Sequence, residues 1–185
     1  MSGAIGRLAL AALLGFALAG CAGEDIPAPS PDLPQHFGAI TTPDTPLQCV
    51  PYAREHSGIP LYGDAYTWWD KAAGRFERGP LPKQGAVMVL TGYAGRNRAH
   101  VAVVKKIVAA REIKVDHANW LDDGAIYVDD PVVDVSPGND WSEVRVWNIR
   151  AGAWGSRVYA VRGFIGPGPD PGTPDLPSSA LISMN

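Results

Sequence analysis

The sequence predicts an α+β domain in which N-terminal helices pack on an antiparallel β-sheet. Signals for helices come first, between Cys49 and Gly74, and short β-rich runs follow Pro80. Helices and strands that are segregated along a chain in this way are typical of such a domain. The 185 residues are enough for one domain with a hydrophobic core, and the sequence contains no internal repeat.

Two helices are expected before the strands. The first begins at Cys49, because Pro51 is tolerated only in the first turn of a helix and Gly58 offers a stop. The second begins at Asp64, a favourable capping residue, and ends at Gly74. The apolar positions of this second helix are Ala65, Trp68, Trp69 and Ala72.

After Pro80, six short runs predict strands, and clusters of Gly, Asn, Asp and Ser between them predict turns. Turn-like connections of this kind suit antiparallel neighbours. The expected strands are Ala86–Leu90, His100–Val104, Glu112–His117, Ile126–Val128, Val144–Trp147 and Val158–Ile165.

Residues 1–20 have the features of a signal peptide. Arg7 is followed by the apolar run Leu8–Ala19, which is too short to span a bilayer as a permanent helix. The sequence Leu18-Ala19-Gly20-Cys21 resembles the bacterial lipobox, which implies a mature protein that begins at a lipidated Cys21. Several acyl chains there would hold it firmly at a membrane. The alternative is ordinary secretory cleavage in the same region.

The rest of the chain divides into three segments. Residues 21–46 are rich in Pro, Asp and Thr and predict an extended linker. Residues 47–165 are the expected folded domain, and the Pro/Gly-rich residues 166–185 are expected to be a disordered tail. The expected location is outside the cytoplasm, anchored by lipid to a bacterial membrane and facing the periplasm or the cell wall.

Charge argues against a nucleic-acid partner. The formal net charge is −3, and loss of Arg7 with residues 1–20 would make it −4. Acidic and basic residues are mixed along the chain, so no basic stripe is available for a phosphate backbone. A monomer without nucleic acid is expected.

Cys49 is the candidate nucleophile. The chain has two cysteines, so lipidation of Cys21 would leave Cys49 without a partner in the mature chain. An unpaired cysteine in an exported protein is either a reactive group or a buried structural thiol. The predicted helix start favours the reactive group, because a helix N-terminus and a neighbouring imidazole lower the pKa of a thiol. Unpaired N–H groups of the same turn would receive an oxyanion.

His100 is the candidate base. It opens a predicted strand just after a polar loop, which places its ring where a substrate can reach it. The alternative is a surface histidine at a strand end. A third group must hold the imidazole in the correct tautomer. His117 and Asn119 lie two residues apart at the end of the next strand, and either is a candidate for this group.

Several segments, in order, resemble the CHAP family of cysteine, histidine-dependent amidohydrolases and peptidases, a papain-like branch used mainly on peptidoglycan. Residues 48–54 read QCVPYAR and are similar to the family's nucleophile segment QCVxYAR. Residues 82–90 read PKQGAVMVL, like the strand that precedes the family's histidine, and residues 99–104 read AHVAVV, like GHVAVV. Residues 113–120 read IKVDHANW, where the family commonly has Glu two positions before Asn and an aromatic residue.

The resemblance implies a papain-like fold and a peptidoglycan amidase or endopeptidase with Cys49 as nucleophile and His100 as base. His117 stands where many members have Glu, and a neutral imidazole is a weaker acceptor than a carboxylate. Asn119 is therefore the preferred orienting residue of a Cys-His-Asn set. Ala86 replaces an Asp that often follows Gly, which concerns the turn rather than catalysis.

No cofactor or metal is implied, and the implied partners are peptidoglycan stem peptides or a related amide substrate. Two other functions remain open. A non-catalytic wall-binding or scaffolding lipoprotein is suggested by His117 in place of the usual acid. An amidase for a non-wall amide would share all the catalytic residues.

Other residues have both a structural and a functional interpretation. Gln48 is a candidate donor to the oxyanion. A zinc site is chemically possible, although the spacing matches no familiar pattern; its ligands would be Cys49, His100, Asp116 and His117. Four aromatic residues could either form the floor of a cleft or fill the core: Tyr52, Trp68, Trp69 and Trp120. For Trp68 and Trp69, a position in the core is preferred. A solvated turn, rather than a calcium loop, is predicted around Gly124 by Asp122, Asp123, Asp129 and Asp130.

Overall fold

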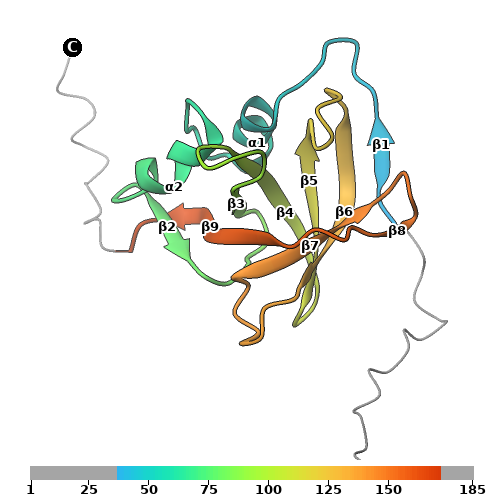
Figure 1. Ribbon diagram of the computed structural model, residues 1–185. Helices are drawn as coiled ribbons and strands as arrows, with labels where there is room; N and C mark the ends of the chain where they lie inside the picture. Colours follow the sequence, from blue (N-terminus) through green and yellow to red (C-terminus); the bar gives the residue numbers. More distant parts are fainter. Residues whose placement is uncertain (1–36, 172–185) are drawn as a thin grey trace, which may run out of the picture. The chain divides into compact units, whose positions relative to one another are not determined.

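The computed structural model describes residues 37–171, in which nine strands form one sheet (Figure 1). The strands pair in the order β1-β6-β5-β4-β3-β9-β7-β8, with β2 on β9, and every pair is antiparallel. The antiparallel sheet of the sequence prediction is thereby confirmed. The strands are β1 (Ala39–Thr41), β2 (Phe76–Gly79), β3 (Val87–Thr91), β4 (Ala99–Ala109), β5 (Glu112–Ala118), β6 (Ile126–Asp134), β7 (Glu143–Asn148), β8 (Ala153–Trp154) and β9 (Tyr159–Pro169).

Six strands form a closed ring. The order β6-β5-β4-β3-β9-β7 returns to its start because β6 also pairs with β7 through Val132 and Val146. The strands of this ring surround one hydrophobic core, which includes Met88, Ala102 and Phe164. A ring of this kind has fewer free edges than an open sheet, which removes a template for aggregation.

The folded part extends beyond residues 47–165 at both ends. Strand β1 lies in the predicted linker and pairs with Ile126–Val128 of β6. Strand β9 continues to Pro169, which pairs with Phe76. These segments have little apolar periodicity of their own, and they are ordered by backbone pairing with distant strands. The predicted signal peptide, Cys21 and residues 172–185 of the predicted tail lie outside the described residues.

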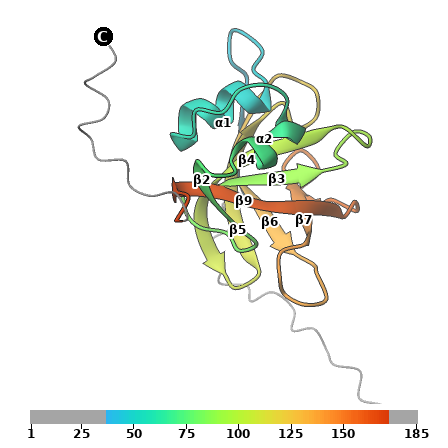
Figure 2. The same ribbon diagram turned by 90° about the vertical axis from the view of Figure 1, so that its left-hand side faces the viewer.

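Alternating side chains of β3 and β4 face two different cores. Met88 and Ala102 point into the ring, whereas Val87 and Val101 belong to a second cluster with residues of the helical segment. This alternation follows from the period of two in a strand. The second cluster contains Ala53 and Trp68, and Figure 2 shows α1 and α2 on the same side of β3 and β4.

Helix α1 (Cys49–Ser57) begins and ends where the sequence predicts. Pro51 lies in its first turn, and Gly58 closes it in the left-handed conformation with φ 68°. Ser57 donates a hydrogen bond from its hydroxyl to the carbonyl of Ala53, which supports the last turn. No helix within residues 37–171 is long and apolar enough to cross a membrane.

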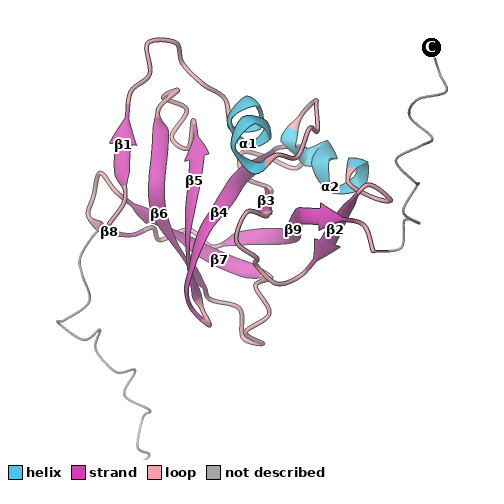
Figure 3. Ribbon diagram, turned by 180° about the vertical axis from the view of Figure 1, so that it is seen from behind, coloured by secondary structure: helices cyan, strands magenta, loops and turns pink. Residues whose placement is uncertain are grey.

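The second predicted helix is only partly correct. It is divided into a 3₁₀ turn, η1 (Ala65–Thr67), and a single turn, α2 (Trp68–Lys71) (Figure 3). Asp64 does not cap it with its side chain. Instead, the carbonyl of Asp64 accepts hydrogen bonds from the N–H and the hydroxyl of Thr67, which tightens the turn to 3₁₀ geometry.

Replacing Gly163 with alanine is expected to destabilise the fold by about 2–4 kcal/mol. Gly163 has φ 144°, and a Cβ there would lie 2.5 Å from the Trp69 ring and 2.9 Å from the carbonyl oxygen of Gly79. Urea unfolding measures the change. Gly79→Ala is the matched control on the paired strand, because nothing lies within 4 Å of its added Cβ. Equal stability of the two variants would contradict this packing argument.

Candidate active site

Cys49 is the first residue of α1 and a free, half-buried thiol. Gln48 precedes it in an extended conformation, with φ −108° and ψ 155°, and its side chain does not cap the helix. The N–H groups of the first turn have no partners inside the helix by geometry. The thiol therefore lies beside uncapped backbone donors.

Cys49 and His100 line the same cleft, which has a volume of about 370 Å³ and is called the histidine cleft here. The two residues are far apart in the sequence, and β4 carries His100 to the N-terminal end of α1. Aromatic and charged side chains form the rest of the wall. The lining residues are Gln48, Cys49, Tyr93, Ala94, Arg98, Ala99, His100, Asn119, Trp120, Leu121, Asp122, Arg157 and Tyr159.

A second cleft, with a volume of about 450 Å³, is also lined by Cys49 and is called the Tyr66 cleft. The two clefts share Gln48, Cys49, Arg98 and Ala99. The nucleophile candidate therefore lies at their junction, where an extended substrate can occupy both. The Tyr66 cleft is lined in addition by Val50, Pro51, Gly63, Asp64, Ala65, Tyr66 and Asn97.

His100 begins a buried chain of hydrogen bonds. Its Nε2 lies 2.9 Å from Nδ1 of His117, and Nε2 of His117 lies 3.0 Å from Oδ2 of Asp130. The exposed fractions are 2% for His100, 1% for His117 and 0% for Asp130. Strands β4, β5 and β6 contribute one member each, so neighbouring strands of the ring hold the three side chains in one hydrogen-bonded chain.

Aromatic rings enclose the two histidines. Tyr93 and Trp120 lie 5.0 and 4.9 Å from the His100 ring, between centroids. Trp120 and Tyr127 lie 5.1 and 5.3 Å from the His117 ring. Burial raises the pKa of Tyr93 to about 12, so its hydroxyl stays protonated and donates to the carbonyl of Trp120. Trp120 is 5% exposed and serves both as core and as cleft wall.

Asn119, the preferred orienting residue of the sequence prediction, makes other contacts. Its Oδ1 accepts a hydrogen bond of 2.7 Å from the N–H of Gly124, and its Nδ2 donates to Oε1 of Gln48 at 3.0 Å. Within residues 37–171 the polar partner of the His100 ring is His117. The backbone of Asn119 has φ 59°, which turns its side chain away from the direction that strand β5 would give it.

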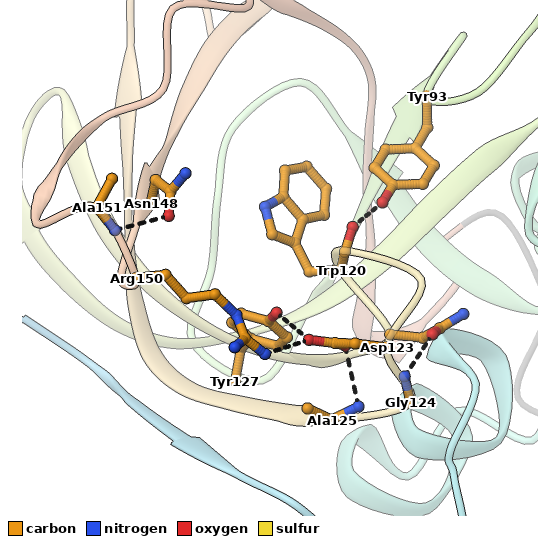
Figure 4. Close-up of polar contacts among 10 residues, drawn as sticks. Tyr93, Trp120, Asp123, Gly124, Ala125, Tyr127, Asn148, Arg150 and Ala151 are labelled. Carbon is orange, nitrogen blue, oxygen red and sulfur yellow. Dashed lines mark hydrogen bonds and ion pairs between the residues drawn. The ribbon is translucent and has the colours of Figure 1, made fainter.

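The loop that carries Trp120 is held by Asp123 (Figure 4). The Asp123 carboxylate accepts hydrogen bonds from the hydroxyl of Tyr127 at 2.6 Å, the N–H of Ala125 at 3.1 Å and the guanidinium of Arg150 at 2.7 Å. These contacts fix the loop on the end of β6. Asp123 is exposed in a bend, as the sequence predicts, and it also anchors the loop.

The expected lowering of the Cys49 pKa is wrong for the resting protein. Burial raises the pKa of the thiol, and it outweighs hydrogen bonding to the backbone at Val101, Val50 and Cys49 and the charge of Arg98. Burial, and then the neighbouring His117, hold the pKa of His100 well below its ordinary range. At neutral pH, the resting pair is therefore a thiol and a neutral imidazole.

The alkylation rate of Cys49 is expected to rise only at alkaline pH, above the titration of a free thiol. The thiolate is the reactive form, and a raised pKa moves its appearance to higher pH. The measurement is the rate of iodoacetamide labelling against pH, with a free cysteine derivative as reference. Fast labelling that is already constant at neutral pH would instead reveal a thiolate–imidazolium pair.

Asp130 is the site residue that sequence reasoning missed. It was predicted to lie in a solvated turn, but it is fully buried on β6 and bonded to His117. The sequence signal that could have identified Asp130 is the apolar run after Pro131, because it indicates that the strand continues beyond Val128. A strand through this segment places Asp130 on the same face as Val132, a core residue.

No group of three or more His, Cys, Asp or Glu in the described part of the chain is arranged to hold a metal ion. Asp116, one of the candidate zinc ligands, accepts a hydrogen bond from the N–H of Asp129 and pairs with Lys105. Its carboxylate therefore has partners of its own.

One of three comparisons with known proteins gives a match. The sequence model of the CHAP domain matches residues 40–119, a range that includes Cys49, His100 and His117 and ends before Asp130. Members of this family are generally hydrolases of the amidase and peptidase type. The searches against curated proteins and against solved structures gave no match. Residues 40–119 of this chain are therefore assigned to the CHAP domain family.

Proposed function

We propose that the protein is a cell-envelope cysteine amidohydrolase or endopeptidase that cleaves amide bonds of peptidoglycan. One observation carries the proposal: a free thiol at a helix start and a hydrogen-bonded imidazole line one cleft. We also propose a papain-like fold, supported by the shared hydrophobic cluster of Ala53 in α1 and Val101 in β4. Cys49 is the proposed nucleophile, and His100 is the proposed base.

The first step is attack on the substrate carbonyl. Cys49 Sγ forms a bond to the carbonyl carbon while its proton passes to Nδ1 of His100, because Nε2 of His100 is engaged with His117. The resting thiol is neutral, so this proton transfer accompanies the attack rather than preceding it. The amide C–N bond then breaks, and the leaving nitrogen takes the proton from His100.

The second step releases the acid product. The acyl group is now a thioester on Cys49. Water attacks its carbonyl carbon and gives a proton to His100, the C–S bond breaks, and the thiolate recovers that proton. The enzyme returns to its thiol and neutral imidazole, and the sum of both steps is hydrolysis of one amide.

Gln48 is the proposed side-chain donor to the oxyanion. The N–H of Gly124 can only donate, so the amide of Asn119 must present Oδ1 to it and Nδ2 to Gln48. The oxygen of Gln48 is then occupied, and its Nε2 remains as a donor beside Cys49. With the uncapped N–H groups at the start of α1, this donor can stabilise the tetrahedral intermediate.

Peptidoglycan is the proposed substrate because the family acts mainly on it and because the sequence predicts export and a lipid anchor at Cys21. Two clefts that meet at Cys49 suit an extended peptide on both sides of the scissile bond. Arg98 and Arg157 line the histidine cleft, and guanidinium groups bind carboxylates such as those of stem peptides. A lipid-anchored monomer is the proposed form.

The scaffold alternative was motivated by His117 in place of an acid. A carboxylate is nevertheless present behind His117, because Asp130 bonds to its Nε2. The substitution of His for an acid is therefore a weaker argument for a non-catalytic scaffold. An amidase for a non-wall amide would use the same residues, and substrates distinguish it.

The test is incubation of the purified mature protein with sacculi, followed by mass spectrometry for new amine and carboxyl ends. Wild type is expected to produce them, and Cys49→Ala is not. Small peptide amides without wall material are assayed in parallel. Cleavage of these alone would replace peptidoglycan by another amide substrate, and cleavage retained in Cys49→Ala would contradict the mechanism.

A further inference from the structure

The chain His100–His117–Asp130 restricts where protons can be. An ionised carboxylate only accepts hydrogen bonds, so the contact with Asp130 requires a proton on Nε2 of His117. In neutral His117, Nδ1 is then an acceptor, and Nε2 of His100 must donate to it. Neutral His100 consequently carries no proton on Nδ1. This is the nitrogen that can receive the proton of the Cys49 thiol.

An imidazole alone would not impose this order. A neutral His117 without a fixed partner presents either a donor or an acceptor at Nδ1, because its two tautomers are close in energy. In the tautomer with a proton on Nδ1, His117 would donate to His100. His100 would then hold its own proton on Nδ1 and could not accept one from Cys49. A fixed acceptor behind His117 removes this inactive arrangement.

Asp130 is an unfavourable residue on grounds of stability. Its exposed fraction is 0%, and its Oδ1 is buried with no hydrogen-bond partner in the described part of the chain. A buried carboxylate with one free oxygen costs stability, and apolar replacements of buried ion pairs are often neutral or stabilising. Its hydrogen bond goes to His117, which points to a role in proton placement.

We propose that Asp130 is a positioning residue for the base, which acts through His117 to keep Nδ1 of His100 unprotonated and ready for the Cys49 thiol. This inference rests on the proposed function of Cys49 and His100, and it adds Asp130 to the set formed by Cys49, His100 and His117. When His100 becomes an imidazolium, its Nε2–H still has an acceptor, and an ionised Asp130 would place a negative charge at the end of the same hydrogen-bonded chain.

The direct test is nitrogen NMR of the histidine rings in protein labelled with ¹⁵N-histidine at neutral pH. The chain has four histidines, and single His→Gln variants assign their signals. Wild-type His100 and His117 are expected to be protonated on Nε2 and unprotonated on Nδ1. A proton on Nδ1 of neutral His100 would overturn the proposal, and this measurement needs no Asp130 variant to fold.

The kinetic test is Asp130→Asn, which keeps the shape of the side chain but offers either an acceptor or a donor to His117. We expect kcat to fall by about 10- to 100-fold and KM to stay unchanged. A loss of this size is found when other groups that orient a functional imidazole are removed. A detectable population of His100 with the proton on Nδ1 is expected to accompany it. Unchanged kcat together with unchanged tautomers in the folded variant would overturn the proposal.

Asp134→Asn is the matched control. Asp134 is also on β6 and 1% exposed, but its Oδ1 accepts from the N–H and hydroxyl of Ser136. It should leave kcat and the histidine tautomers unchanged. If wild type does not cleave sacculi, the proposed function fails while the NMR result still decides the positioning role. If wild type cleaves and Asp130→Asn matches it in kcat and tautomers, only the positioning role fails.

Discussion

Cys49→Ala and His100→Ala are each expected to lower kcat by roughly 10⁴- to 10⁶-fold, and the double variant should lose no more than either single variant. The two side chains share one proton in both steps of the proposed reaction, so removal of one makes the other useless. Both line the histidine cleft, and the ring of His100 is fixed by His117. The measurement is turnover of sacculi or of a soluble stem-peptide amide at saturating substrate.

His56→Ala is the control for the loss of an imidazole. His56 lies on the exposed side of α1, where its Nδ1 bonds to the carbonyl of Tyr52, and it lines neither cleft. It should keep kcat within a factor of about two, since it touches none of the reacting groups. Losses that multiply in the Cys49/His100 double variant would show that the two residues act independently, contrary to the mechanism.

Local sequence signals predicted the elements that depend on local chemistry. The start and end of α1 followed from Pro51 and Gly58, because these residues restrict the backbone wherever they occur. The buried segments of β3 and β4 followed from their apolar runs. The second helix was predicted less well, because the competing hydrogen bonds of Thr67 to Asp64 leave only single turns there.

The closure of the sheet into a ring could not be predicted from local sequence signals. It depends on β6 pairing with both β5 and β7, and on β9 lying between β3 and β7. Strand β1 has only three residues, and nothing in them distinguishes a strand from a linker. Such pairings are set by backbone hydrogen bonds between segments far apart in sequence, which a pattern read along one chain does not contain.

The candidate site also combines residues that local sequence signals predict with residues that they do not. Cys49 and His100 were accessible from motif residues, but the choice between His117 and Asn119 was not. A regular strand puts both on one face, whereas the pairing of β5 with β6 shifts register between Val115 and His117, and Asn119 has a positive φ. These irregularities redirect side chains, and strand periodicity does not predict them.

Asn119 and Gln48 offer a way to separate two roles that the sequence left open. If Asn119 orients His100, its loss affects the base. If it orients Gln48, as the hydrogen bond of 3.0 Å suggests, its loss acts only through the oxyanion donor. The loop around Asn119 is held independently by Asp123, so the loop is expected to survive removal of the Asn119 side chain.

Gln48→Ala is expected to lower kcat by about 10²- to 10³-fold with little change in KM, since an oxyanion donor acts mainly in the transition state. Asn119→Ala should cost less, about tenfold, because Gln48 remains but loses its fixed orientation. In the double variant, the loss should equal that of Gln48→Ala alone, because Asn119 then has nothing left to orient. A further loss in the double variant, measured by the same turnover assay, would return Asn119 to a direct role on His100.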